Sequence, residues 1–141
     1  MIFAKSPRNS GLMKRFALII FFTVYFIGGF AQTSEKEAIT KAIRTGDSKK
    51  VASYFLPSVD LTVVSVEDVY SRDQAEMIVQ RFFERNSPSE FNLKHEGKSK
   101  LDDYYYIGSL KTDKGNYRLT FFLKKGDQDF RIKQFRIESE D

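Results

Sequence analysis

The chain has 141 residues, with 23 Lys and Arg, 19 Asp and Glu, one His and neither Cys nor Trp. This length suits one domain, and the missing cysteine excludes disulfides, thiolate metal sites and cysteine nucleophiles. Residues 1–31 hold four basic residues and no acidic one, which leaves 19 of each sign in residues 32–141. We therefore expect no nucleic-acid partner, since phosphate binding draws on a surplus of positive charge.

The N-terminal segment has the order of a secretory signal peptide. A basic pair after Met13 precedes an apolar run over residues 16–27, and small residues end the segment. We predict that residues 1–31 are a signal peptide cleaved between Ala31 and Gln32, with the true start at Met13. An uncleaved membrane anchor is the alternative, although the run is shorter than the roughly 20 apolar residues that span a bilayer.

The predicted location follows from this segment. Export without a cysteine after the apolar run implies a periplasmic or extracellular protein that is not lipid-anchored. We expect no membrane association after cleavage, and a single domain over residues 32–141.

Two helices are predicted at the start of that domain. Ser34 and Glu37 have capping-box spacing, and the helix they open would end at Gly46. Its apolar stripe comprises Ala38, Ile39, Ala42 and Ile43. Asp47 is placed to cap a short second helix that buries Val51 and Phe55 and stops before Pro57.

A short hairpin and a long helix are predicted next. Alternating apolar residues begin at Val59, a turn is expected at Glu67-Asp68, and Val69-Tyr70 would return as a strand. Ser71 and Gln74 form a second capping box, which opens the long helix. The apolar stripe of this helix comprises Ala75, Ile78, Val79, Phe82 and Phe83. Asn86-Ser-Pro88 would end it.

The last fifty residues predict four antiparallel strands. The strands cover residues 91–98, 104–111, 117–124 and 130–138, with a hairpin turn at 113–116. In the first strand, simple alternation puts Phe91, Leu93, His95 and Gly97 on one face.

The last strand contains a break in its alternation. In a regular strand Phe130 and Ile132 would point to one face, whereas Phe135 and Ile137 would point to the other. A strand changes faces only by inserting a residue, so we predict a β-bulge near Lys133-Gln134. Bulges bend sheets. The element order therefore predicts an α+β fold in which a strongly curved antiparallel sheet wraps around three helices.

Several motifs together resemble a known family. They are residues 42–47 (AIRTGD), 69–75 (VYSRDQA), 81–83 (RFF), 95–97 (HEG), 106–110 (YIGSL) and 115–118 (GNYR). This combination is similar to the exported Bacteroidetes proteins grouped as domain of unknown function 4783. The resemblance implies a cone-shaped nuclear-transport-factor-2-like (NTF2-like), cystatin-like fold over roughly residues 34–138. It implies no catalytic residue, because the family has no assigned activity.

The residues themselves contain no catalytic, metal or cofactor motif. Asp127 and Asp129 have the spacing of the first two ligands of a calcium-binding loop. The next Asp or Asn, the Gly and the distal Glu of that motif are missing, so we expect a solvated turn. His95 is the one histidine. Alternation places it toward the helices, either as a hydrogen-bonded core residue or as a pocket residue and general base. Tyr70, Tyr104 and Tyr106 are the other candidate pocket residues.

The opposite sheet face offers a candidate interface. Strand parity places Tyr105, Ile107 and Phe122 together there, where they could form an apolar patch and a homodimer contact through the sheet. The leading hypothesis is a non-enzymatic exported module that binds a small molecule or an envelope protein, without a cofactor. The alternatives are a metal-independent isomerase or dehydratase using His95, and a structural dimerisation component of an envelope assembly.

Overall fold

A computed structural model describes the backbone of residues 27–140 and the side chains of residues 34–140. Its contacts separate two compact units, Met1–Thr33 and Ser34–Asp141. Most of the predicted signal peptide, residues 1–26, lies outside the described residues, and residues 27–33 are helical. Over the described part of the chain, no helix is both long enough and apolar enough to cross a membrane.

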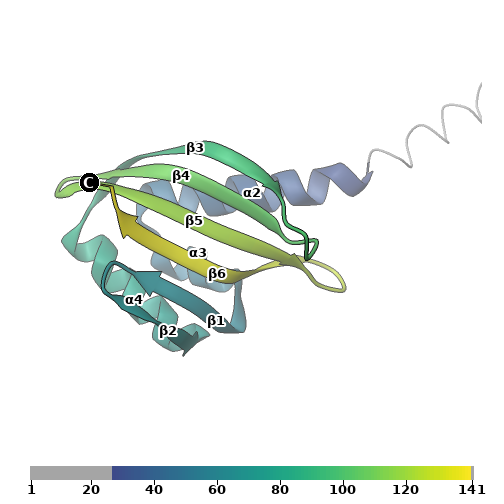
Figure 1. Cartoon of the computed structure of the whole chain (residues 1–141), viewed down its shortest axis with the longest axis horizontal. Helices are drawn as coiled ribbons and strands as arrows, with labels where there is room; N and C mark the ends of the chain where they lie inside the picture. The colour runs from purple at the N-terminus through teal and green to yellow at the C-terminus, as the bar shows by residue number, and fades with distance from the viewer. Residues whose placement is uncertain (1–26, 141) are drawn as a thin grey trace, which may run out of the picture. The chain divides into compact units, whose positions relative to one another are not determined.

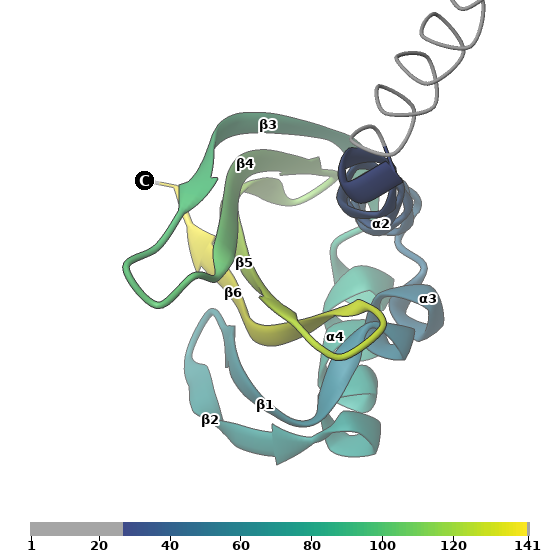
Figure 2. The ribbon, with the colours of Figure 1, turned by 90° about the vertical axis from the view of Figure 1, so that its right-hand side faces the viewer.

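The order of elements follows the order predicted from the sequence. The elements are α2 (Ile27–Thr45), α3 (Ser48–Ser53), β1 (Phe55–Val63), β2 (Val66–Ser71), α4 (Arg72–Arg85), β3 (Pro88–Lys98), β4 (Tyr104–Thr112), β5 (Gly115–Lys125) and β6 (Phe130–Ser139). Figure 1 shows the four long C-terminal strands side by side and the hairpin of β1 and β2 beside β6. Figure 2 shows the helices gathered against one side of the curved sheet.

The six strands form one sheet in the order β2-β1-β6-β5-β4-β3. Every neighbouring pair is antiparallel except β1 and β6, which run parallel. The α+β class with a strongly curved sheet and three helices is confirmed. The parallel pair brings the first strand against the last, and local patterns in the sequence carry no information about that long-range pairing.

Helix ends mostly obey the predicted capping rules. Gly46 has a φ of +68°, and the Asp47 N–H donates to Ala42 O at 2.8 Å, as in a glycine-terminated helix. Asp47 Oδ1 then accepts from the Lys50 N–H, and Ser71 forms the predicted capping box of α4. The cap at Ser34 is wrong, because α2 already runs through this residue from Ile27.

The first hairpin turns earlier than expected. Val63 pairs with Val66, so the turn is Val64-Ser65 and not Glu67-Asp68. Val64 has a φ of +57° and is half exposed. A β-branched residue rarely adopts this left-handed conformation, so the turn is strained. Phe55, expected at the end of α3, instead opens β1 and is fully buried.

The bulge predicted in β6 is confirmed. Ile132 pairs with Leu123 and Gln134 pairs with Phe122, which leaves Lys133 as the extra residue. Ile132 and Phe135 consequently both face the core and are fully buried. The core is otherwise built from the predicted helix stripes and the inward faces of β1 and β4 to β6.

A second bulge lies in β3 and changes the placement of His95. Leu93 pairs with Gly108 and His95 pairs with Ile107, so Lys94 is the extra residue. Directly paired residues of an antiparallel ladder share a face, and His95 therefore lies with Ile107 on the face away from the helices. His95 is exposed. The expectation that it faces the helices is wrong, because simple alternation ignores the inserted residue.

Candidate functional site

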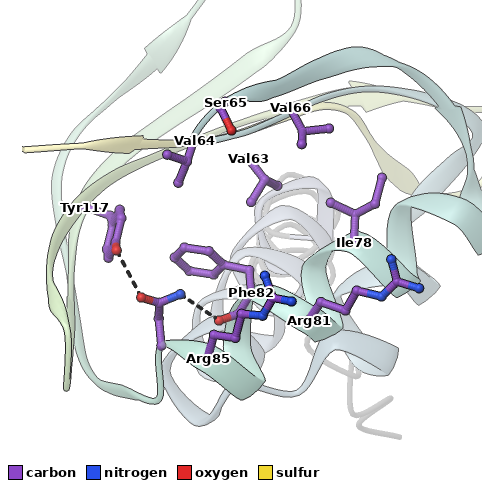
Figure 3. Close-up of a pocket in the computed structure, with 10 residues that line it drawn as sticks. Val63, Val64, Ser65, Val66, Ile78, Arg81, Phe82, Arg85 and Tyr117 are labelled. Atoms are coloured by element: carbon purple, nitrogen blue, oxygen red, sulfur yellow. Dashed lines mark hydrogen bonds between the residues drawn. The ribbon is translucent and has the colours of Figure 1, made fainter.

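A pocket of about 360 Å³ lies between α4, the hairpin of β1 and β2, and the start of β5. Figure 3 shows the hairpin residues on one side of the pocket and the α4 side chains on the other. Its lining residues are Val63, Val64, Ser65, Val66, Ile78, Arg81, Phe82, Arg85, Asn86 and Tyr117. This volume falls within the usual range for small-molecule sites.

The inner wall of the pocket is apolar. Ile78 and Phe82 are one helical turn apart in α4, so they share a face, and Val63 and Val66 approach from the hairpin. The ring of Tyr117 meets that of Phe82 edge to face, with 5.0 Å between centroids. Phe82 is only 5% exposed, so the floor of the pocket is the edge of the core.

One end of the pocket is fixed by a hydrogen-bond chain. The Tyr117 hydroxyl donates to Asn86 Oδ1 at 3.0 Å, and Asn86 Nδ2 donates to Phe82 O, also at 3.0 Å. Asn86 is the C-cap of α4, and its backbone N–H also donates to Phe82 O. The chain joins the end of α4 to β5 and fixes the orientation of the Tyr117 ring.

The only charged side chains in the described lining are two arginines. Arg81 and Arg85 are one turn apart on α4, and Figure 3 shows both extending from the helix side of the pocket. Within residues 34–140, neither guanidinium has a carboxylate within 4 Å or a hydrogen-bond acceptor. By contrast, Arg136 donates to Glu67 and Arg72 donates to Phe55 O.

The candidate pocket residues chosen from the sequence lie elsewhere. Tyr106 is 2% exposed and stacks on Phe121 at 4.9 Å, whereas Tyr104 is half-buried on the same sheet face. Tyr70 is half-buried in β2, where it pairs with Val59. None of these tyrosines lines the pocket described above. The structure does not bring them together with His95, which lies on the opposite sheet face.

The inward faces of β3 and β4 instead meet α2 around Lys36, in a region we call the α2 end. Lys36 Nζ is 2.6 Å from Glu96 Oε2 and lies 5.7 Å above the centre of the Tyr106 ring. The Glu35 carboxylate accepts from the Phe130 N–H at 3.0 Å. Here the charged side chains of α2 contact partners from the sheet.

Burial raises the pKa of the Glu35 carboxyl above its ordinary value. The hydrogen bond from the Phe130 N–H acts in the opposite direction, while nearby Asp129 raises the pKa further and Arg131 lowers it. Burial is the largest of these influences, so the net shift of the Glu35 pKa is upward.

The candidate interface residues do lie together on the outer sheet face. Tyr105 pairs with Phe122 across the strands, with 6.0 Å between ring centroids, and Ile107 follows on the same face of β4. All three are half-buried. The Tyr105 ring lies so close over Gly97 that a Cβ there would be 2.5 Å from the Tyr105 hydroxyl oxygen. The Tyr105 ring therefore packs over the backbone of the neighbouring strand β3.

The described residues contain no group of three or more acidic or histidine side chains that could hold a metal ion. The pocket itself was missed by the sequence reasoning, although part of its signal was visible. Arg81 and Arg85 flank the apolar stripe of α4 at a spacing of one turn. The contribution of the hairpin was not visible, because its turn was predicted three residues too late.

Comparison with known proteins assigns the family. The model of the family described as "Domain of unknown function (DUF4783)" matches residues 36–138. The chain belongs to the DUF4783 family. A crystal structure of a DUF4783 family protein from Bacteroides ovatus is 31% identical and has a TM-score of 0.69, over 74% of this chain and 94% of that chain.

More distant structures share the fold of this DUF4783 protein. A domain of unknown function with a cystatin-like fold from Nostoc punctiforme is 11% identical, with a TM-score of 0.63 over 80% of this chain and 79% of that chain. A designed NTF2-like protein is 18% identical, with a TM-score of 0.59 over 74% of this chain and 96% of that chain. No curated protein matches the chain. The fold expected from the resemblance is confirmed.

Proposed function

We propose that this DUF4783 protein is an exported, non-enzymatic module that binds a small ligand in the pocket between α4 and the β1–β2 hairpin. One observation carries the proposal: a pocket of drug-like size combines an apolar inner wall with two arginines that have no partner in the described chain. Such a site offers burial for an apolar body and donors that orient a polar group. The signal-like segment at residues 1–31 supports an exported location.

Native mass spectrometry of the protein recovered from an exporting host tests this proposal. We expect a stoichiometric extra mass on each chain. The variant Val66→Trp should abolish it, because Val66 lines the pocket and a tryptophan there would fill the space. Val69→Trp is the matched control, since Val69 lies in the same strand, is 62% exposed and is not part of the lining. Equal retention of the mass by both variants would contradict the pocket assignment.

A second candidate function is homodimerisation through the sheet, and the cluster of Tyr105, Ile107 and Phe122 favours it. Half-buried aromatic rings on an open sheet face are typical of protein contacts. Size-exclusion chromatography with light scattering should then give a dimer that Phe122→Asp converts into a monomer. An unchanged mass would count against this interface. The enzymatic alternative has no comparable support, because His95 is exposed and apart from the candidate tyrosines.

A further inference from the structure

The pocket described above is unevenly charged. Among the described lining residues, two are cationic and none is acidic, whereas the opposite wall is aliphatic or aromatic. Arg81 and Arg85 share one face of α4, so their charges repel each other across one helical turn. Within residues 34–140, no carboxylate lies within 4 Å of either guanidinium.

Hydrogen-bond chemistry then restricts what can bind. A guanidinium only donates, and its planar fork matches the paired oxygens of carboxylate and phosphate groups. The other polar groups at the pocket are partly used internally: the Tyr117 hydroxyl donates to Asn86, and the Val64 N–H donates to Ile137 O at 2.8 Å. Besides the Ser65 hydroxyl, the side-chain donors left available in the described lining are those of the two arginines.

The apolar part restricts the ligand further. Val66, Ile78 and Phe82 present hydrocarbon surface beside the arginines, within a volume of about 360 Å³. A small inorganic anion would leave this surface wet, and a neutral hydrocarbon would make no use of the exposed guanidinium donors of Arg81 and Arg85.

We infer that the ligand is a small single-chain amphiphile whose anionic head group binds Arg81 and Arg85, and whose apolar chain lies against Val66, Ile78 and Phe82. This inference rests on the proposed function and names its ligand class. Because a carboxylate and a phosphate monoester share the same acceptor chemistry, the head group is decided by experiment.

The test compares decanoate, decyl phosphate and decanol as probes of the protein recovered from an exporting host, with affinities measured by calorimetry at pH 7. NMR shifts of the Ser65, Val66 and Tyr117 amides locate the site. We expect at least one anionic probe to bind about tenfold more tightly than decanol, since a charge-assisted contact should provide at least this factor. The tighter anionic probe identifies the head group.

Variants separate charge recognition from burial. The double variant Arg81→Gln with Arg85→Gln should lower the affinity for the anionic probe about tenfold, to the level of decanol, and leave decanol binding within about twofold. Arg118→Gln is the matched control, because Arg118 is an exposed arginine of β5 outside the pocket. It should change neither affinity.

Two failures are distinguishable. If decanol shifts the pocket amides and binds as tightly as both anionic probes, the head-group inference is overturned while the ligand-binding proposal stands. If no probe shifts these amides, both are overturned. An equal loss of anion affinity in Arg118→Gln would also overturn the inference, since it would reduce the effect to overall charge.

Discussion

The two ends of the β4–β5 ladder differ in whether their charged side chains have partners within the described chain. At the α2 end, near Tyr104, Lys36 pairs with Glu96, and the Glu35 carboxylate accepts a backbone hydrogen bond from β6. At the pocket end, near Tyr117, Arg81 and Arg85 have no partner in the described chain. One end uses its charged side chains to join elements, and the other leaves them available.

The difference indicates which end can bind a ligand without breaking contacts inside the protein. Removing one member of a partly buried ion pair leaves the other charge without a partner, and a ligand could reach such a charge only by breaking the pair. Unpaired charges beside apolar surface lose little when a ligand arrives. The comparison predicts that substitutions of charged residues at the α2 end change stability, whereas substitutions of charged residues at the pocket end change binding.

The largest stability effect is expected at the ion pair of Asp103 and Lys133, which joins the start of β4 to the β6 bulge. Asp103 is 4% exposed. Asp103→Asn leaves Lys133 without its anion and should lower the free energy of unfolding by about 2 kcal/mol, between the values for exposed and buried pairs. Urea unfolding measures this change.

The neighbouring residue provides the control. Asp102 pairs with Lys98, but its side chain is 87% exposed, so Asp102→Asn should change the stability by less than about 0.5 kcal/mol. Asn also tolerates the positive φ of 63° at this position. Equal effects of the two variants would mean that burial does not decide the strength of pairs at this end.

The strained turn at the pocket end should respond in the opposite direction. Val64→Gly removes the side chain that disfavours a φ of +57°, and we expect a stability gain of about 0.5 to 1 kcal/mol, after the entropy cost of glycine is subtracted. Val69→Gly, at an exposed valine within β2, should instead lose about that amount. Thermal unfolding of both variants would show whether the strain is real, and a loss in Val64→Gly would contradict it.

The smallest effect is a pH dependence at Glu35. Its pKa is raised in the folded protein, so the folded state binds the proton more tightly than the unfolded state. The contribution of this group to stability is present below the unfolded pKa and is lost as the pH rises from about 4.5 through the folded pKa. Glu35→Gln keeps an acceptor for the Phe130 N–H and removes the titration.

The measurement is the difference in melting temperature between wild type and Glu35→Gln at pH 4 and at pH 7. Wild type should lose stability relative to the variant at the higher pH. A difference that stays constant, or that changes in favour of wild type, would show that the Phe130 hydrogen bond outweighs burial at this carboxylate.

The two bulges show how far the sequence determines the fold. In β6, apolar residues on both sides of the insertion reveal the change of phase, so the bulge at Lys133 was predicted. In β3, no apolar residue follows His95 before the strand ends, so the insertion at Lys94 leaves no trace in the pattern. The orientation of His95 depended on this insertion, and so did the prediction that His95 lines a pocket.

The pocket was hidden for a related reason. Val64-Ser65 contains none of the glycine, asparagine or aspartate residues that are typical of a tight hairpin turn. The turn was therefore predicted at the acidic pair Glu67-Asp68. Helix capping at Asp47 and Ser71 was predictable, because it depends only on near neighbours. Features that depend on pairing between distant strands were not.

The bulge at Lys94 also affects how the protein behaves at high concentration. β3 lies at one edge of the sheet, where unpaired backbone groups can form hydrogen bonds with strands of other molecules. The inserted residue, Lys94, interrupts the regular row of backbone donors and acceptors, and its side chain and that of Lys98 add charge to this edge. This edge therefore resists aggregation by strand addition.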